Sequence, residues 1–287
     1  MGYKNSGYTL DCKGVLAGLD RPRVMGILNA TDDSFFAASR VRVNTERASA
    51  PVDLAGRMLE EGADFLDVGG QSTRPGSRAL SAAEETDRVL PVIEAIVRHY
   101  PAALVSVDTY HSGVARAAVR AGAAMVNDIS AGLFDPSMLS TVAALRVPYI
   151  AMHMQGTPQT MQADPHYGDV ALEVCDFLAD AAHRAVAAGI HDVVLDPGFG
   201  FGKTLSHNYT LLSELDRLSV LGRPLLVGVS RKSMIYKTLG VTPEAALNGT
   251  TALHMAALLK GAHILRVHDV APAVEVVRLW EALGGGK

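Results

Sequence analysis

Short apolar runs recur along the chain, and each of them ends in polar residues. The runs are apolar throughout rather than alternating, which is typical of strands buried on both faces of a parallel sheet. Between them lie segments with apolar residues at helical spacing. The expected strands cover residues 24–29, 65–70, 104–109, 124–128, 149–153, 193–196, 225–231 and 264–269, and the expected helices cover 52–61, 83–99, 112–121, 136–145, 169–188, 209–218, 243–260 and 271–283.

This strict alternation of strand and helix predicts an α/β fold with a parallel sheet covered by helices. Eight such units in a chain of 287 residues favour a TIM (β/α)8 barrel. No repeat, low-complexity tract or linker divides the sequence, so we expect a single domain. Residues 1–22 are expected to form a polar N-terminal lead-in, and residues 23–287 the barrel domain.

Composition narrows the classes of partner. Hydrophobic residues make up 48% of the chain and charged residues 20%, which is ample for a large core. The net charge of −4 argues against a nucleic-acid surface. No run of apolar residues is long enough to suggest a membrane span or a secretion signal. The two cysteines match no metal or redox spacing, so a cytoplasmic protein without a disulfide is the expectation.

One glycine-rich loop is the most distinctive local feature. The apolar run 193–195 stops at Asp196, and Gly198, Gly200 and Gly202 follow at alternate positions. Such glycines let backbone N–H groups approach a ligand closely. The spacing fits neither a P-loop nor the dinucleotide fingerprint, and a strand followed by a plain glycine turn is the alternative.

The loops after the strands of a barrel share one face, so polar residues at these strand ends are expected to converge. Carboxylates and an amide suit a flat heterocycle that carries amino and ring N–H groups. Basic residues, with an amide oxygen that could hold a metal, suit a phosphate. The converging candidates are Asn29, Thr73, Arg74, Asp108, Asn127, Asp196, Lys232, Arg266 and His268.

Each candidate alone has a structural alternative. Asp108 could cap the helix that begins at Ser112, Asn127 could be a turn residue, Arg266 a structural ion pair and His268 a surface imidazole. No zinc-ligand spacing and no nucleophile motif is present. Any metal is therefore expected to be Mg²⁺, bound partly through the phosphates of the ligand.

Seven motifs follow one another along the chain: MGILN (25–29), GQSTRPG (70–76), SVDT (106–109), VNDI (126–129), DPGFGFGK (196–203), SRKS (230–233) and RVHD (266–269). Taken in order, they resemble those of the dihydropteroate synthases, and the match runs from about residue 25 to about residue 283. The resemblance implies a homodimeric, cytoplasmic TIM-barrel transferase of folate biosynthesis, the enzyme that sulfonamides target.

The resemblance also implies a reaction. It joins 6-hydroxymethyl-7,8-dihydropterin diphosphate to 4-aminobenzoate and releases 7,8-dihydropteroate and pyrophosphate. Elementary chemistry agrees, because a reduced pterin can delocalise a methylene cation while Mg²⁺ and basic residues stabilise the departing diphosphate. The aromatic amine then attacks without needing a strong general base.

Residue roles follow from the same resemblance. The pterin ring would be held by Asp108, Asn127, Asp196 and Lys232, with Met152 packing beside it. The diphosphate would be held by Arg266, by His268 and, through Mg²⁺, by Asn29. The aminobenzoate site would be shaped by Thr73, Arg74, Pro75, Phe201 and Ser233. The residues nearest the chemistry would be Lys232, Arg266 and His268, with Asp33 and Phe35 of the first loop.

The first loop departs from the family pattern. The family has a second acid where this chain has Ala37, and the glycine pair that follows is missing. Residues 30–45 are expected to form a mobile lid that orders over the bound substrates. The altered lid leaves a non-catalytic pterin-binding paralogue as one alternative. A pterin-dependent methyltransferase is the other, although it would not need Thr73, Arg74 or the pair Arg266 and His268.

Overall fold

The computed structural model describes residues 7–30, 49–71 and 78–285. Its main sheet has eight parallel strands in the order β8-β7-β6-β5-β4-β3-β10-β9. A parallel bridge between Leu195 and Leu225 joins the two ends of this sheet, which confirms the predicted TIM barrel. The strands are β3 (Arg23–Asn29), β4 (Phe65–Gly69), β5 (Leu104–Asp108), β6 (Met125–Asp128), β7 (Tyr149–Met152), β8 (Val193–Asp196), β9 (Leu226–Val227) and β10 (Ile264–Val267).

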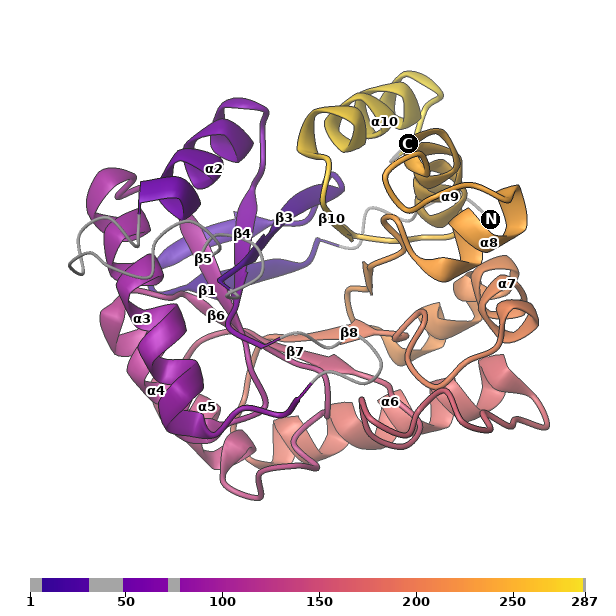
Figure 1. Ribbon diagram of the computed structural model, residues 1–287. Helices are drawn as coiled ribbons and strands as arrows, with labels where there is room; N and C mark the ends of the chain where they lie inside the picture. The colour runs from indigo at the N-terminus through magenta and orange to yellow at the C-terminus, as the bar shows by residue number, and fades with distance from the viewer. Residues whose placement is uncertain (1–6, 31–48, 72–77, 286–287) are drawn as a thin grey trace.

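Helices surround the strands on the outside of the ring (Figure 1). Their apolar faces and the outer faces of the strands form one continuous hydrophobic layer. The helices are α2 (Ser49–Glu60), α3 (Ala82–His99), α4 (Ser112–Ala121), α5 (Met138–Leu145), α6 (Val170–Ala187), α7 (Leu205–Ser213), η1 (Leu215–Leu221), α8 (Ser233–Leu239), α9 (Leu247–Leu259) and α10 (Val270–Ala282). None of these described helices is long and apolar enough to cross a membrane.

Three elements differ from the sequence-based expectation. The seventh barrel strand was expected over 225–231, but β9 has only two residues because the chain turns at Val229, whose carbonyl accepts the Lys232 N–H at 3.1 Å. Helix α7 begins before the expected 209 because the Thr204 side chain caps it by accepting from the His207 N–H. The expected helix 243–260 begins later, at Leu247, and a separate short helix, α8, precedes it.

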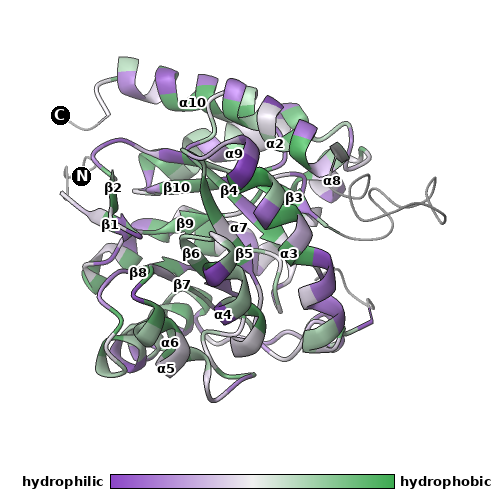
Figure 2. Cartoon of the chain, turned by 90° about the vertical axis from the view of Figure 1, so that its left-hand side faces the viewer, coloured by the Kyte–Doolittle hydropathy of each residue, from purple (hydrophilic) through white to green (hydrophobic). Residues whose placement is uncertain are grey.

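The N-terminal segment, expected to be a polar lead-in, contains a β-hairpin. Strands β1 (Thr9–Cys12) and β2 (Val15–Gly18) pair antiparallel around Lys13 and Gly14, which have φ of 58° and 88°. The hairpin lies at one end of the barrel (Figure 2). Its buried side chains pack on residues from the first halves of the barrel strands, so it closes the N-terminal end of the ring. This plug cluster comprises Leu10, Cys12, Leu19, Met25, Phe65, Ala124, Met125, Ile150, Val194, Leu226 and Ile264.

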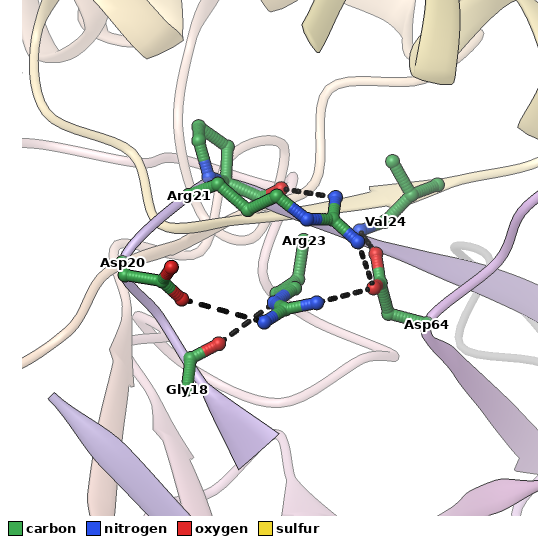
Figure 3. Close-up of polar contacts among 7 residues, drawn as sticks. Gly18, Asp20, Arg21, Arg23, Val24 and Asp64 are labelled. Carbon is green, nitrogen blue, oxygen red and sulfur yellow. Dashed lines mark hydrogen bonds and ion pairs between the residues drawn. The ribbon is translucent and has the colours of Figure 1, made fainter. Parts of the chain in front are cut away.

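Polar contacts connect the end of the hairpin with the start of the barrel (Figure 3). Asp64, just before β4, accepts from Arg21 Nη2 at 2.8 Å and from Arg23 Nη1 at 2.9 Å. Its second oxygen accepts the Val24 N–H at 2.9 Å, and Arg23 Nε donates to the Gly18 carbonyl at 2.7 Å. Arg23 therefore connects the end of the hairpin at Gly18 with the Asp64 carboxylate, which itself joins the start of β3 to the start of β4. Because the hairpin occupies this end, the carboxyl end of the barrel remains for a site.

Candidate active site

The described candidate residues lie at the carboxyl ends of the barrel strands or after them, including Met152, Phe201 and Ser233, which only the family resemblance had implied. They come from seven of the eight strands or the loops that follow them, and they therefore face one end of the ring. They are Asn29 (β3), Asp108 (β5), Asn127 (β6), Met152 (β7), Asp196 and Phe201 (β8 and its loop), Lys232 and Ser233 (before and in α8), and Arg266 and His268 (β10 and its loop).

Four of the polar side chains at this end form one bonded group, which we call the acid–arginine cluster. Arg266 Nε donates to Asp67 Oδ2 at 2.6 Å, and its Nη2 donates to Asp108 Oδ2 at 2.7 Å. Asn127 Nδ2 donates to the same Asp67 oxygen at 2.9 Å. The cluster thus joins β4, β5, β6 and β10 across the barrel.

The cluster decides between the alternatives left open for Asp108. Its carboxylate is bonded to Arg266, whereas the Ser112 N–H at the start of α4 donates to Asp135 Oδ2 at 2.7 Å. The hypothesis that Asp108 caps this helix is therefore wrong. Arg266 does form ion pairs, as its structural alternative required, with Asp108 at the end of β5 and with Asp67 in the middle of β4.

Asp196 and Lys232 lie beside this cluster and carry opposite charges. Asp196 is buried and accepts the Gly198 N–H at 2.8 Å. Lys232 Nζ donates to the Phe199 carbonyl at 2.5 Å and lies 4.9 Å from the centre of the Phe201 ring. A flat ring bound here would meet an acid, an ammonium and an aromatic face together.

The glycine-rich loop, residues 198–202, is held in one conformation by side chains. Each of its five carbonyl oxygens accepts a hydrogen bond from a side chain, so the loop is rigid before any ligand arrives. The donors are Lys203 Nζ to Gly198 O (2.9 Å) and to Phe201 O (3.2 Å), Lys232 Nζ to Phe199 O (2.5 Å), Gln162 Nε2 to Gly200 O (2.6 Å) and Tyr167 OH to Gly202 O (2.8 Å).

The loop glycines serve packing rather than ligand access. The Gly198 N–H is used by Asp196, and the Gly200 N–H donates to Asn208 Oδ1 at 2.7 Å. A Cβ at Gly198 would lie 1.8 Å from the His153 carbonyl, and φ at this position is 69°. The expectation that these two N–H groups meet a ligand is therefore wrong, because the segment after β7 passes against the loop.

A buried ammonium lies beneath this loop. Lys203 Nζ contacts His153 Nδ1 at 2.8 Å in addition to the two loop carbonyls, so three partners surround its three hydrogens. Burial, and then the Lys203 charge, lower the pKa of His153 to about 2. The neutral imidazole therefore accepts from Lys203, which agrees with the expectation that His153 packs rather than catalyses.

Burial changes the titration of the residues that would meet a ring. It raises the pKa of Asp196, against the opposing charge of Lys232, and it raises the pKa of Asp108, against that of Arg266. Burial also lowers the pKa of Lys232 to about 8, although Asp196 favours its ammonium form. Lys232 therefore titrates within about one pH unit of neutrality, as binding-site groups often do.

His268 lies at the more open side of the same face. Its backbone N–H donates to Ser230 Oγ at 3.1 Å, and its Nδ1 also lies 3.1 Å from that hydroxyl. Desolvation, and then the charges of Arg266 and Arg231, lower the pKa of His268 to about 4. The imidazole is therefore neutral at pH 7 in the free protein, ready to gain charge beside an anion.

Known proteins are similar to this chain over almost its whole length. The family described as pterin binding enzymes matches residues 25–268. The dihydropteroate synthase of Escherichia coli K12 is 45% identical over 275 residues, which cover 95% of each chain. That of Haemophilus influenzae is 42% identical over 92% of this chain and 94% of its own. The chain belongs to the dihydropteroate synthases.

Solved structures of dihydropteroate synthases agree with this assignment. The Xanthomonas albilineans enzyme with 4-aminobenzoic acid superimposes with a TM-score of 0.89 at 46% identity, covering 96% of this chain and 98% of that one. The same enzyme in complex with 7,8-dihydropteroate gives 0.86 at 44% identity, over 96% and 99%. The Yersinia pestis enzyme in a sulfonamide drug complex gives 0.89 at 42%, also over 96% and 99%. The chain is thus a transferase of folate biosynthesis and belongs to a class of sulfonamide targets.

Five of the predicted site residues lie outside the described residues. They belong to the first and second loops, together with Ala37 and the whole of the expected lid except Ala30. The base of the second loop is described: Gln71 donates to the Tyr110 hydroxyl at 2.7 Å and accepts the Leu80 N–H at 3.1 Å. The five residues are Asp33, Phe35, Thr73, Arg74 and Pro75.

Asp67 is the site residue that the sequence reasoning missed. It is fully buried, it bonds both Arg266 and Asn127, and among the described residues no partner reaches its other oxygen, Oδ1. The available signal was an acid in the middle of the apolar run 65–68, where an unpaired charge would be costly. Asp67 lies at the centre of a strand rather than at its end, so it does not fit the pattern of polar residues at strand ends.

The residues present suit a metal ion that arrives with its ligand. Among the described residues, no group of three or more histidines, cysteines, aspartates or glutamates could hold a metal ion. Asn29, at the end of β3, offers one amide oxygen from a half-buried position. Mg²⁺ accepts one or two protein oxygens when substrate phosphates and water supply the rest, so this donor fits it.

Proposed function

We propose that this chain joins 6-hydroxymethyl-7,8-dihydropterin diphosphate to 4-aminobenzoate at the carboxyl end of its barrel, giving 7,8-dihydropteroate and pyrophosphate. The observation that carries the proposal is the convergence of buried acids, an amide and an ammonium around the acid–arginine cluster. This is the set of donors and acceptors that the amino and ring N–H groups and the carbonyl of a pterin require. Membership of the dihydropteroate synthases supports the same reaction.

The pterin ring occupies the space between Asp196, Asp108 and Asn127. Asp196 accepts from the amino and ring N–H groups, and these charge-assisted bonds are the strongest contacts to the ring. Lys232 leaves the Phe199 carbonyl and donates to the ring carbonyl, while Met152, buried at the end of β7, packs against the ring. Asp67 keeps Asn127 and Arg266 oriented from below.

The diphosphate lies toward His268 and Arg266. The Arg266 guanidinium is already held by Asp67 and Asp108. Its remaining N–H groups can therefore bind the diphosphate without further loss of side-chain rotamer freedom. The neutral imidazole of His268 donates to a phosphate oxygen or takes up a proton, since the arriving negative charge raises its pKa.

Bond exchange then requires little from side chains. The C–O bond between the pterin methylene and the diphosphate breaks, and its electron pair leaves with pyrophosphate. The amine nitrogen of 4-aminobenzoate forms the new C–N bond and releases its proton. The residues hold the ring, the leaving group and the amine in line, and they place positive charge where the leaving group departs.

Mg²⁺ is the proposed cofactor, with Asn29 as its protein ligand. The amide oxygen at the end of β3 and the diphosphate oxygens would hold the ion between them. Bound there, Mg²⁺ would supply positive charge that stabilises the departing diphosphate.

The 4-aminobenzoate site is formed by Phe201, Ser233 and residues of the first two loops. Phe201 is held by the rigid glycine-rich loop, and Ser233 begins α8 directly after Lys232. Sulfonamides, as analogues of the amine, would compete for the same place. From the loops we assign Thr73, Arg74 and Pro75 to the amine, with Asp33 and Phe35 closing over it.

A homodimer in the cytoplasm is the proposed form of the enzyme. Three successive helices each carry an exposed leucine that a second copy could cover: Leu239 on α8 is 53% exposed, Leu259 on α9 59% and Leu279 on α10 60%. Both cysteines are free, which suits a reducing compartment. Sedimentation of the purified protein at several concentrations would measure its mass in solution.

A coupled pyrophosphate-release assay tests the function. Release that requires both substrates and Mg²⁺, with 7,8-dihydropteroate as the product, is the expected result. Pterin binding without release would identify a non-catalytic paralogue. Methyl transfer from a reduced folate, with no pyrophosphate formed, would identify a methyltransferase.

Phe35→Ala should raise the KM for 4-aminobenzoate and leave pterin diphosphate binding unchanged.

A further inference from the structure

Two loops with different proposed tasks are joined by side chains outside the substrate pocket. The loop after β9 carries Lys232, and the loop after β10 carries His268. Between them, Arg231 Nε donates to Asp269 Oδ2 at 2.8 Å and its Nη2 to Oδ1 at 2.6 Å. Ser230 Oγ accepts from the His268 N–H at 3.1 Å alongside. A two-bond arginine–carboxylate pair fixes both distance and orientation.

The backbone of Arg231 is held in a conformation that arginine rarely adopts. Its φ is 54°, and the Lys232 N–H closes a turn onto the Val229 carbonyl at 3.1 Å. The third residue of such a turn is ordinarily a glycine. The Arg231 N–H donates to Thr250 Oγ1 on α9 at 3.1 Å, so the strained turn is fixed at both its backbone and its side chain. Strain of this kind gathers at functional positions.

Asp269 is also diverted from its usual task. It is the N-cap residue of α10, where an aspartate normally accepts an N–H of the first helical turn, yet its side chain makes no such bond. Both carboxylate oxygens accept from Arg231 instead, and the Ala271 N–H donates to Glu61 Oε2 at 3.3 Å. A glycine at position 231 and an aspartate at position 269 that caps α10 would suit the local backbone better. The local structure therefore does not explain the Arg231–Asp269 pair.

We infer that the Arg231–Asp269 pair is a positioning device that sets the separation between the ring-binding loop and the diphosphate-binding loop. The inference rests on the proposed roles of Lys232 and His268. The C–O bond that breaks lies between the two groups they hold, so the loops must be correctly placed at the same moment. Each loop alone would still bind its own part of the substrate.

The test compares Arg231→Gly and Asp269→Asn with the wild type by pyrophosphate release and by calorimetry. Glycine adopts the positive φ freely and asparagine keeps the shape of aspartate, so both variants should fold. We expect kcat to fall about 10- to 100-fold, as small misplacements do. Affinities for 6-hydroxymethyl-7,8-dihydropterin alone and for magnesium pyrophosphate alone should stay within about threefold.

Arg146→Gly is the matched control. Arg146 also has a positive φ, 54°, but it is exposed at the end of α5. This variant should keep the wild-type kcat. If Arg231→Gly fails to fold, Asp269→Asn decides alone.

Two outcomes would overturn the inference. A kcat within twofold of the wild type in Asp269→Asn would show that the pair is only structural. A loss of pyrophosphate affinity equal to the loss in kcat would make Arg231 a ligand of the diphosphate itself. A wild-type enzyme that released no pyrophosphate would instead overturn the proposed function.

Discussion

Single residues of this site work as partnered buried charges. Asp67 and Asp108 share the one guanidinium of Arg266, and each carboxylate is mostly or wholly buried. Removing one member of such a group leaves the others uncompensated, which costs more than the lost bond alone. Substitutions that keep shape and change only charge are therefore the most informative at this scale.

Asp196→Asn tests the pterin site. An amide cannot accept two donors from the ring as a carboxylate can, and each charge-assisted bond contributes about 1.5–3 kcal/mol. Pterin affinity measured by calorimetry should fall at least about 100-fold, with the barrel still folded by circular dichroism. Asp192→Asn is the control. Asp192 lies just before the same strand, at the opposite end from Asp196, where it accepts the Asp11 N–H, so this variant should bind pterin normally. Near-normal affinity in Asp196→Asn would remove the assignment.

His268→Ala tests the diphosphate site. In the proposed site the imidazole would meet the leaving group but not the ring, so affinity for the pterin diphosphate should fall about 10-fold or more, the effect of one bond to a charged group. Affinity for the bare hydroxymethylpterin should change little. His183→Ala, on the exposed side of α6, is the control. Equal losses of affinity for the two ligands would show that His268 contacts the pterin ring or stabilises the fold instead.

At the scale of elements, buried polar contacts fix the loops to the barrel. The glycine-rich loop after β8 is held by donors from its own end, from the long segment after β7 and from Lys232. On the other side of the barrel, Glu85 on α3 accepts from Thr109 Oγ1 at 2.9 Å just after β5. Helix α3 is thereby tied to the strand that carries Asp108.

Glu85→Gln should change the dependence of stability on pH. Burial raises the pKa of Glu85 to about 7 from its ordinary 4.5. The folded state then binds more protons than the unfolded state between these values, so stability falls as pH rises through this window. Glutamine keeps the bond from Thr109 and cannot ionise. At pH 8 the variant should be more stable by on the order of 1 kcal/mol in urea unfolding. A parallel pH profile for both proteins would contradict the prediction.

At the scale of the whole molecule, the two ends of the barrel have separate duties. The N-terminal hairpin closes one end with apolar side chains and the ion pairs of Asp64, whereas the other end collects the polar residues. Stability of the closed end and chemistry of the open end should therefore be separable by mutation. This division is general for the fold.

Leu10→Ala tests this separation. Leu10 is 2% exposed in the plug cluster, and such a truncation typically costs 2–5 kcal/mol, so we expect a loss of about 3 kcal/mol in urea unfolding. The kcat and KM of the folded enzyme should be unchanged. Leu16→Ala in the same hairpin, where the side chain is 71% exposed, should change stability by less than about 0.5 kcal/mol. A large change in KM from Leu10→Ala would show that the two ends are coupled.

The sequence by itself determined the barrel and the face on which its polar residues gather. Apolar runs of strand length, most of them ending in a polar residue and followed by a helix, leave few arrangements other than parallel strands with a shared carboxyl end. Asp108, Asn127, Asp196, Lys232 and Arg266 were found in this way, because their positions follow from local periodicity alone.

Tertiary structure alone decided which of these residues touch. The bonds of Arg266 to Asp67 and Asp108 span 199 and 158 residues, and they depend on strand order and on the closing of the ring. The same is true of the hairpin plug, whose alternating residues looked polar until the barrel end was there to bury half of them. The glycines after Asp196 looked like a ligand loop until the segment after β7 was packed against them. Local pattern specifies an element and its faces, but pairing between distant elements depends on packing, which no short window of sequence contains.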